Sequence, residues 1–230
     1  MNKSKVDGRK KELRLTTKGR EVMEQLQEAT GDVAQAVEQL FTETHHDLWA
    51  AIEDVEYLLG QQSLLARVQQ QRKRREQAFV EIVDYTSSDQ SDFARLNYHW
   101  IEKYFTIEAA DRHSLDHPQE KIVAPGGHIF MAKYKGETVG TVAMIKMNDS
   151  TFELAKMAVD EAAQGLSIGW RLGQAVIDKA KSIGAKRLYL ESNTMLTPAI
   201  NLYHKLGFER IVGPPSPYER SNIQMELCLE

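Results

Sequence analysis

The sequence has a single cysteine among 230 residues, so an internal disulfide is excluded. It has no apolar run near the roughly 20 residues that a transmembrane helix needs. Its basic N-terminus also lacks the apolar segment of a secretory signal. These absences predict a soluble protein of the reducing cytoplasm without a membrane contact. We expect Cys228, which lies in an alternating segment at 223–229, to be a buried strand residue.

The ligand spacing of a metal site is missing as well. His45 and His46 are adjacent, but no second pair at helical spacing accompanies them. Surface histidines are the simpler interpretation, so we predict no bound metal.

The net charge of −4 is unevenly distributed. Residues 1–20 hold eight Lys or Arg and two acidic residues, a net charge of +6. Residues 21–78 hold five Lys or Arg and eleven acidic residues, a net charge of −6. Residues 79–230 carry the remaining −4. An acidic main part argues against general nucleic-acid binding, and only the basic end suits a phosphate backbone.

Apolar periodicity predicts two helices in the first third of the chain. In residues 18–41 the apolar positions recur at steps of three and four, with Thr16 or Thr17 as N-cap. A second helix is expected from about residue 44 to 75, ending in a solvated, frayed linker at 69–77. We place the domains at 1–76 and 77–230. The two helical stripes must be buried against a second copy, giving a homodimer, or against the C-terminal domain.

The segment from Val6 to Arg20 resembles the wing and following helix of MarR-type winged-helix regulators. In that family a turn with Asp and Arg leads into a strand ending in L-T-x-K-G, and here Leu15-Thr16-Thr17-Lys18-Gly19 follows Asp7 and Arg9. The resemblance covers residues 6–70 and implies a truncated domain, since there is no room before residue 6 for a helix-turn-helix. Without a recognition helix the major groove cannot be read, so a helical hairpin for packing or dimerisation is favoured over DNA binding.

The C-terminal domain alternates strands and helices. The expected strands are Phe79–Tyr85, Ile129–Tyr134, Thr138–Met147, Phe152–Val159, Arg187–Glu191, Glu209–Val212 and Asn222–Leu229. The expected helices span 89–105, 108–117, 166–183 and 196–206. A strand that feeds a small-residue turn and a helix start presents free backbone N–H groups and the positive end of the helix dipole. The segment Gln164-Gly165-Leu166-Ser167-Ile168-Gly169 is therefore predicted to bind the pyrophosphate of a nucleotide-bearing cofactor.

Two motifs in this domain resemble those of the GNAT superfamily of N-acetyltransferases. The family turn reads Q/R-x-x-G-x-G/A, matched here by Gln164 and Gly169, with Ser167 at the place of the middle glycine. The second motif, L-Y-x-K-x-G-F, is matched fully at residues 202–208. The resemblance covers residues 79–230 and implies an α/β (α+β) fold with a mixed, mainly antiparallel sheet. It also implies acetyl-CoA as the cofactor and a small-molecule amine as the acceptor.

The resemblance assigns roles to residues of the two motifs and their neighbours. Backbone pairing with the pantetheine arm falls to Met157, Ala158 and Val159, and phosphate binding falls to Gln164, Gly165, Leu166, Ser167, Ile168, Gly169 and Trp170, with Arg171 as a helper. Asn193 either touches the pantetheine amides or caps the turn into the next helix. Tyr203 is the expected general acid, because a phenol suits protonation of a leaving thiolate. Glu153 is the expected base, whereas Lys156 is expected to be structural or on the surface.

The acceptor pocket is expected from the helix at 89–105, the Gly126-Gly127 loop and the tail. Trp100, Tyr104 and Phe105 are candidates for its wall, although an aromatic face is more often plain core. Tyr218 and Arg220 precede the last strand, and an arginine there can hold a carboxylate bidentately, which suggests an amino acid as acceptor. Two rival functions remain open, a MarR-type transcription regulator with a CoA-sensing domain and a catalytically inactive CoA-binding module.

Overall fold

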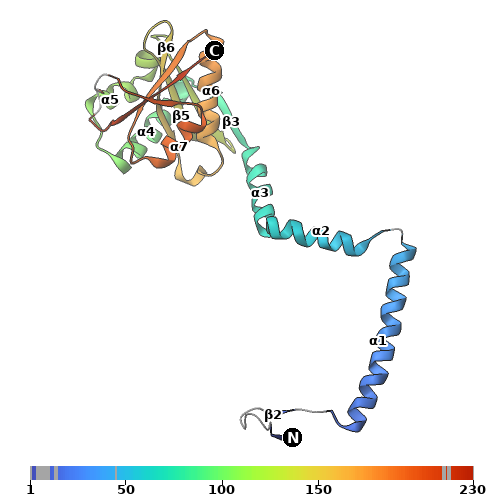
Figure 1. The fold of residues 1–230 in the computed structure, drawn as a ribbon. Coiled ribbons are helices and arrows are strands. Elements are labelled where there is room, and N and C mark those ends of the chain that lie inside the picture. Colours follow the sequence, from blue (N-terminus) through green and yellow to red (C-terminus); the bar gives the residue numbers. More distant parts are fainter. Residues whose placement is uncertain are drawn as a thin grey trace. The chain divides into compact units, whose positions relative to one another are not determined.

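The computed structural model describes residues 2–3, 11–12, 15–44, 46–213, 216 and 219–229. Its contacts divide the chain into two units, Met1–Arg67 and Val68–Glu230. Figure 1 colours them from blue at the N-terminus to red at the C-terminus. The sequence predicted a domain boundary between residues 76 and 77; by contacts, residues 68–77 of the helix that ends at Gln77 belong to the C-terminal unit.

The N-terminal unit is built from helices. A short ladder first joins β1 (Asn2–Lys3) to β2 (Lys11–Glu12). Helix α1 (Thr17–Glu43) starts where the Thr16 side chain accepts a hydrogen bond from the Gly19 N–H, which is one of the two caps that the sequence offered. Asp7 and Arg9, which belong to the winged-helix resemblance, and His45 lie outside the described residues.

The predicted second helix is in fact two helices. Helix α2 (Leu48–Gln61) has Gln62 as its C-cap, and α3 (Leu64–Gln77) begins after Ser63, whose Oγ accepts from the Ala66 N–H at 3.2 Å. The expectation of a frayed linker at 69–77 was also wrong, because this segment forms the last turns of α3.

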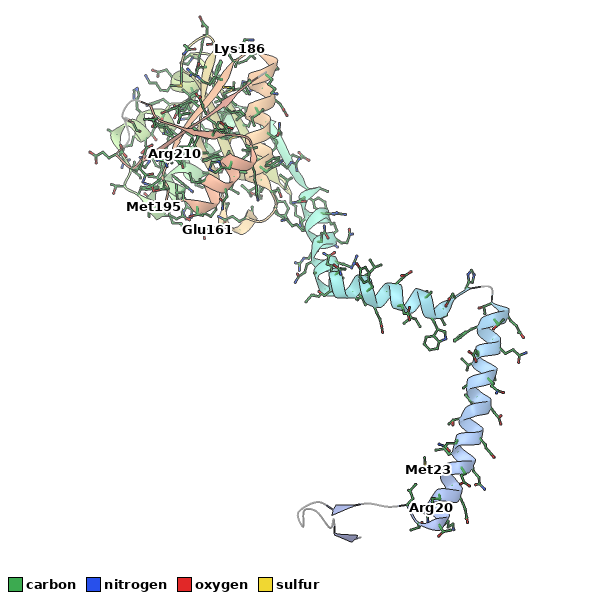
Figure 2. The ribbon with its side chains drawn as sticks, in the orientation of Figure 1. Arg20, Met23, Glu161, Lys186, Met195 and Arg210 are labelled. Atoms are coloured by element: carbon green, nitrogen blue, oxygen red, sulfur yellow. The ribbon has the colours of Figure 1, made fainter. Side chains whose placement is uncertain are left out.

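No residue of these three helices is buried in the described chain. What covers their apolar stripes therefore stays a prediction. The apolar stripe of α1 lies in solvent, with Leu26, Val33 and Leu40 each more than half exposed. Met23, labelled in Figure 2, extends the same exposed surface.

The C-terminal unit is organised by a seven-stranded sheet. Its strand order is β3-β4-β5-β6-β7-β9-β8, and every neighbouring pair is antiparallel except β6 and β7. The strands are β3 (Val80–Asp84), β4 (His128–Tyr134), β5 (Glu137–Lys146), β6 (Thr151–Val159), β7 (Arg187–Ser192), β8 (Glu209–Ile211) and β9 (Ile223–Cys228). The helices are α4 (Gln90–Tyr104), α5 (Ala109–Asp116), α6 (Ile168–Ser182) and α7 (Thr197–Lys205), with short turns at η1 (Ser87–Asp89), η2 (Gln119–Val123) and η3 (Glu161–Ala163). The predicted mixed, mainly antiparallel α/β fold is confirmed (Figure 1).

Helices cover both faces of this sheet. Successive residues of β4 alternate between two core clusters, with Ile129 and Met131 in one and Phe130 and Ala132 in the other. The first cluster lies under α4, and the second lies under α6 and α7. Burial on both faces explains why these strands read as nearly continuous apolar runs.

Strand β9 follows the same alternation, and it corrects one expectation. Ile223 and Met225 are buried and share a face, whereas Cys228 lies on the opposite face and is exposed. Among the described residues, no helix combines the length and the apolarity needed to cross a membrane.

Candidate active site

The site starts where the two parallel strands part. Strands β6 and β7 pair only from Thr151 to Glu153. Beyond that point β6 carries a bulge, since Thr141 pairs with Ala158 but Ala143 pairs with Ala155, which leaves two residues of β6 opposite one of β5. Lys156 in this bulge has a φ of 51°. A bulge bends a strand and increases its twist, so the second half of β6 leaves one edge without a ladder.

A cleft of about 670 Å³ opens at this parting. Its wall combines β6, the end of β7, the start of α6, one side of α7 and the aromatic side of α4. Glu161 of η3, labelled in Figure 2, lies on the same wall. The cleft therefore gathers residues from α4 and from the segments around the ends of β6 and β7.

Residues 164–170, here called the α6 turn, form one end of the cleft. Gly165 and Ser167 have φ values of 82° and 62°, and Ser167 is the residue that precedes α6. In this described stretch no backbone N–H from residue 165 to residue 170 is bonded to a protein acceptor. These N–H groups and the positive end of the α6 dipole make a site suited to an anion.

Most of the predicted cofactor residues line the cleft. They are Met157, Val159, Gln164, Gly165, Ser167, Ile168, Gly169, Trp170 and Asn193. Three others do not. Ala158 is buried, Leu166 packs against the core, and Arg171 donates to the Gln77 carbonyl at 3.1 Å. Their roles in binding stay predictions.

Asn193 has both ends of its side chain engaged. Its Oδ1 accepts from the Met195 N–H at 2.9 Å, and its Nδ2 donates to the Arg220 carbonyl at 2.7 Å. This arrangement supports the turn-capping alternative for Asn193, although the residue also lines the cleft.

Tyr203 reaches the cleft from α7. It is 8% exposed, and its ring lies 6.2 Å from that of Phe208 in an edge-on contact. Burial raises the pKa of the Tyr203 phenol to about 12. The hydroxyl therefore keeps its proton across the physiological range and can donate it.

Glu153 lies on the cleft wall just where β6 and β7 part. No hydrogen bond or ion pair links its carboxylate to another described residue. Burial and the nearby charge of Glu191 raise the pKa of Glu153 to about 7, and the ammonium of Lys156 opposes the rise. Glu191 is held by the hydroxyls of Tyr189 and Ser216, so the two carboxylates differ in their surroundings. A carboxylate with a pKa near neutrality is suited to accept a proton at physiological pH.

A buried ion cluster adjoins the cleft, because two of its members, Lys156 and Arg220, line the cleft wall. The carboxylate of Asp111, with a side chain 0% exposed, receives a bidentate pair of hydrogen bonds from Arg220 at 2.7 Å each and one from Lys156 at 2.9 Å. Arg220 also donates to Glu108 at 2.8 Å. Burial alone would raise the pKa of Asp111, but the hydrogen bonds from Arg220 and Lys156 outweigh it and hold the pKa below its usual value.

The sequence did not identify Asp111 or Glu108. Arg220 is 109 residues away from Asp111, and no local pattern marks a partner at such a distance. Of the two expectations for Lys156, the structural one holds, since its ammonium is nearly buried and pairs with Asp111.

The aromatic residues of α4 meet at the cleft as expected. Trp100 lies 5.6 Å from Tyr104 and 5.8 Å from Phe105 between ring centroids, and all three line the wall. The Gly126-Gly127 loop does not line it. A Cβ at Gly127 would meet the Ile122 carbonyl oxygen at 2.5 Å, so this glycine serves close packing. Tyr218 lies outside the described residues.

Comparisons with known proteins agree with this geometry. A family model described as Acetyltransferase (GNAT) family matches residues 94–208. A curated relative, the uncharacterized N-acetyltransferase YjgM of Escherichia coli (strain K12), is 35% identical over 101 residues, which is 43% of this chain and 60% of that protein. The chain thus covers less than two thirds of that relative.

Two solved structures show the same fold. An acetyltransferase of the GNAT family from Staphylococcus aureus Mu50 superposes with a TM-score of 0.61 at 22% identity, covering 66% of this chain and 99% of its own. The protein yncA of Salmonella typhimurium, a putative acetyltransferase solved with its cofactor acetyl-CoA, has a TM-score of 0.53 at 18% identity. The match covers 66% of this chain and 94% of that chain.

Proposed function

Because the chain belongs to the acetyltransferase (GNAT) family, we propose that it is an N-acetyltransferase that moves an acetyl group from acetyl-CoA to the amine of a small molecule by direct attack in a ternary complex. The observation that carries the proposal is that one cleft holds a carboxylate able to accept a proton and a phenol able to donate one. Glu153, with a pKa of about 7, can take a proton, and Tyr203, with a pKa of about 12, can give one.

The described residues fit the donor at two points. The unbonded N–H groups of the α6 turn would hold its pyrophosphate. The half of β6 without a ladder to β7, Met157 to Val159, offers backbone groups to the pantetheine arm. Acetyl-CoA supplies an activated acetyl group as a thioester.

The chain's own residues would supply the proton transfers. Glu153 takes the proton that the acceptor ammonium must lose before its nitrogen can attack. As the carbon–nitrogen bond forms and the carbon–sulfur bond breaks, Tyr203 gives its proton to the leaving sulfur. A backbone N–H of β6 at the thioester oxygen would stabilise the charge that develops there.

An amino acid is our proposal for the acceptor, with Tyr218 and Arg220 at its carboxylate. The structure adds a condition, since the Arg220 guanidinium already holds Asp111 and Glu108 and would have to exchange one of them. The measurement is the acceptor KM of Arg220→Lys, which keeps the charge but loses the planar bidentate geometry. An unchanged KM overturns this acceptor.

We further propose that the N-terminal helices join two copies of the chain and that the protein works in the cytoplasm. The exposed stripe of α1 supports the first, and the lone cysteine supports the second. The resemblance to MarR-type regulators stays a prediction. A gel shift with genomic DNA fragments tests it, and retarded fragments would favour the regulator.

Calorimetric titration of acetyl-CoA, followed by turnover with a panel of amines, tests the enzyme. We expect saturable donor binding, acetylation of at least one amine, and a kcat at least about 10-fold lower in Tyr203→Phe with an unchanged donor affinity. Absence of donor binding at millimolar concentration would contradict the proposal. Binding without turnover of any amine would instead indicate the inactive CoA-binding module.

A further inference from the structure

The last turns of α3 are fixed against the α6 turn. The Gln77 Nε2 donates to Ser167 Oγ at 2.8 Å, and the Gln77 carbonyl accepts from Arg171 at 3.1 Å. All three residues belong to the C-terminal unit. Two bonds from one glutamine therefore hold the helix end beside the proposed phosphate site.

A second anchor holds the same helix end from the sheet side. The carboxylate of Glu76 accepts from the Tyr134 hydroxyl at 2.6 Å and pairs with Lys135 at 2.9 Å. Since Glu76 and Gln77 are both engaged, the direction of the preceding helical turn is set as well.

Lys73 lies one helical turn before Gln77 and so projects from the same side of α3. It lines the same cleft as Gly165, Ser167 and Trp170. In the described part of the chain its ammonium makes no hydrogen bond or ion pair. Arg72 is rotated by about 100° around the helix from Lys73 and does not line the cleft.

The α6 turn needs a full positive charge that its own residues do not provide. Backbone N–H groups and the helix dipole supply the equivalent of about half a charge. The first turn of α6 has no lysine, and the Arg171 guanidinium is directed to Gln77. A CoA thioester carries a pyrophosphate and a 3′-phosphate, which is more negative charge than Arg171 and Lys205, the latter also on the cleft wall, would balance alone.

We propose that Lys73 of α3 is a phosphate ligand of the acyl donor, held in place through the Gln77–Ser167 contact. The inference rests on the proposed function, and it adds a residue that lies outside the 94–208 segment matched by the family model. It also gives a reason for Ser167 where the family motif has glycine. The hydroxyl that a glycine would lack is the acceptor that anchors Gln77.

The test is calorimetric titration of CoA, 3′-dephospho-CoA and pantetheine into the full chain and two variants. Lys73→Gln removes the proposed ligand, and Arg72→Gln removes the same charge one position away as a matched control. We expect Lys73→Gln to weaken CoA binding about 10-fold, as for a charge-assisted hydrogen bond, and Arg72→Gln to change it less than about 2-fold.

The three ligands identify the phosphate. Loss of affinity for CoA alone assigns Lys73 to the 3′-phosphate, and loss for both CoA and 3′-dephospho-CoA assigns it to the pyrophosphate. Pantetheine, which has neither, should bind the variants and the parent chain equally. A Lys73→Gln affinity for CoA equal to that of Arg72→Gln overturns the inference while leaving the proposed function intact, whereas a parent chain that binds no CoA overturns both.

A double-mutant cycle with Gln77→Ala tests the anchoring. If Gln77 acts by placing Lys73, Gln77→Ala weakens CoA binding by itself but adds less than about 2-fold to Lys73→Gln. Full additivity of the two changes would contradict that part of the inference.

Discussion

Glu153 combines a cleft position with a carboxylate that makes no hydrogen bond or ion pair to another described residue. Because its pKa is raised to about 7, it is protonated and inactive as a base below that pH. We expect kcat/KM of the parent chain to fall about tenfold per pH unit below pH 7, since this parameter reports ionisation of the free enzyme.

Glu153→Gln should lower kcat/KM at least about 100-fold and should abolish the fall of kcat/KM below pH 7, the acid limb of the pH profile. Turnover measured from pH 5 to 9 checks both expectations. The same acid limb in the variant would assign the titration to another group.

Ser167 has a φ of 62°, a left-handed conformation that costs a side chain about 1–2 kcal/mol. Ser167→Gly and Ser167→Ala both remove the hydroxyl that accepts from Gln77, so their difference isolates the backbone strain. We expect the glycine variant to be more stable than the alanine variant by about 1 kcal/mol in urea unfolding. Equal stabilities would mean that the turn relaxes to another conformation.

Single residues were predictable where a motif spans a few positions. The resemblance of two short motifs pointed to Tyr203 and the α6 turn, and the structure brings them to one cleft with Glu153. The role of Asp111 could not be predicted from the sequence, because its partners Lys156 and Arg220 are 45 and 109 residues away. Cys228 was wrongly expected to be buried, because an alternating pattern predicts a strand but does not say whether its odd-numbered or its even-numbered residues face the core.

Among the elements, α5 and the segment before β9 depend on one buried ion cluster. In Asp111→Asn the ammonium of Lys156 and the guanidinium of Arg220 would lose their buried counter-charge. Removing one partner of a buried pair costs about 3–5 kcal/mol, so we expect a loss of that size in urea unfolding at pH 7. Glu108→Gln is the matched control, and it should cost at most about 1 kcal/mol because Glu108 is partly exposed.

The pH dependence of this loss has a definite sign. The pKa of Asp111 is lowered in the folded chain, so its contribution is present above the ordinary aspartate pKa and is lost as the pH falls through the folded value. The free energy of unfolding of Asp111→Asn should therefore approach that of the parent chain in acid. An equal gap at pH 7 and at about pH 3 would contradict this account.

Elements of the C-terminal unit were predicted well because strand and helix periods alternate clearly along it. The break between α2 and α3 was missed for a physical reason. The Arg67 guanidinium donates to the carbonyls of Leu58 and Gln62, and Ser63 caps α3, so side chains terminate both helices without interrupting the apolar pattern.

On the scale of the whole molecule, the two units differ in what they bury. The C-terminal unit has two core clusters, whereas no residue of α1 or α2 is buried. Val33, 64% exposed, lies in the apolar stripe of α1, and Gln35 lies on the other side of that helix, about 200° away. A contiguous exposed stripe of this kind marks an interaction surface.

If two copies join through the stripe, Val33→Glu should sediment as a monomer at concentrations where the parent chain and Gln35→Glu sediment as dimers. Turnover per chain should be unchanged in both variants. A monomeric parent chain would overturn the proposed dimer. The sequence predicted the stripe but could not identify its partner, because periodicity reports only that a face is apolar.

The parting of β6 and β7 has a consequence for deuterium uptake. Alternate amides of β6 beyond Glu153 point away from β5 toward an edge that has no ladder, so they should exchange with solvent without unfolding of the sheet. A pantetheine arm paired along this edge would slow their exchange. Mass spectrometry of a peptide covering 154–159 would then report donor occupancy directly, even in variants such as Glu153→Gln that no longer turn over.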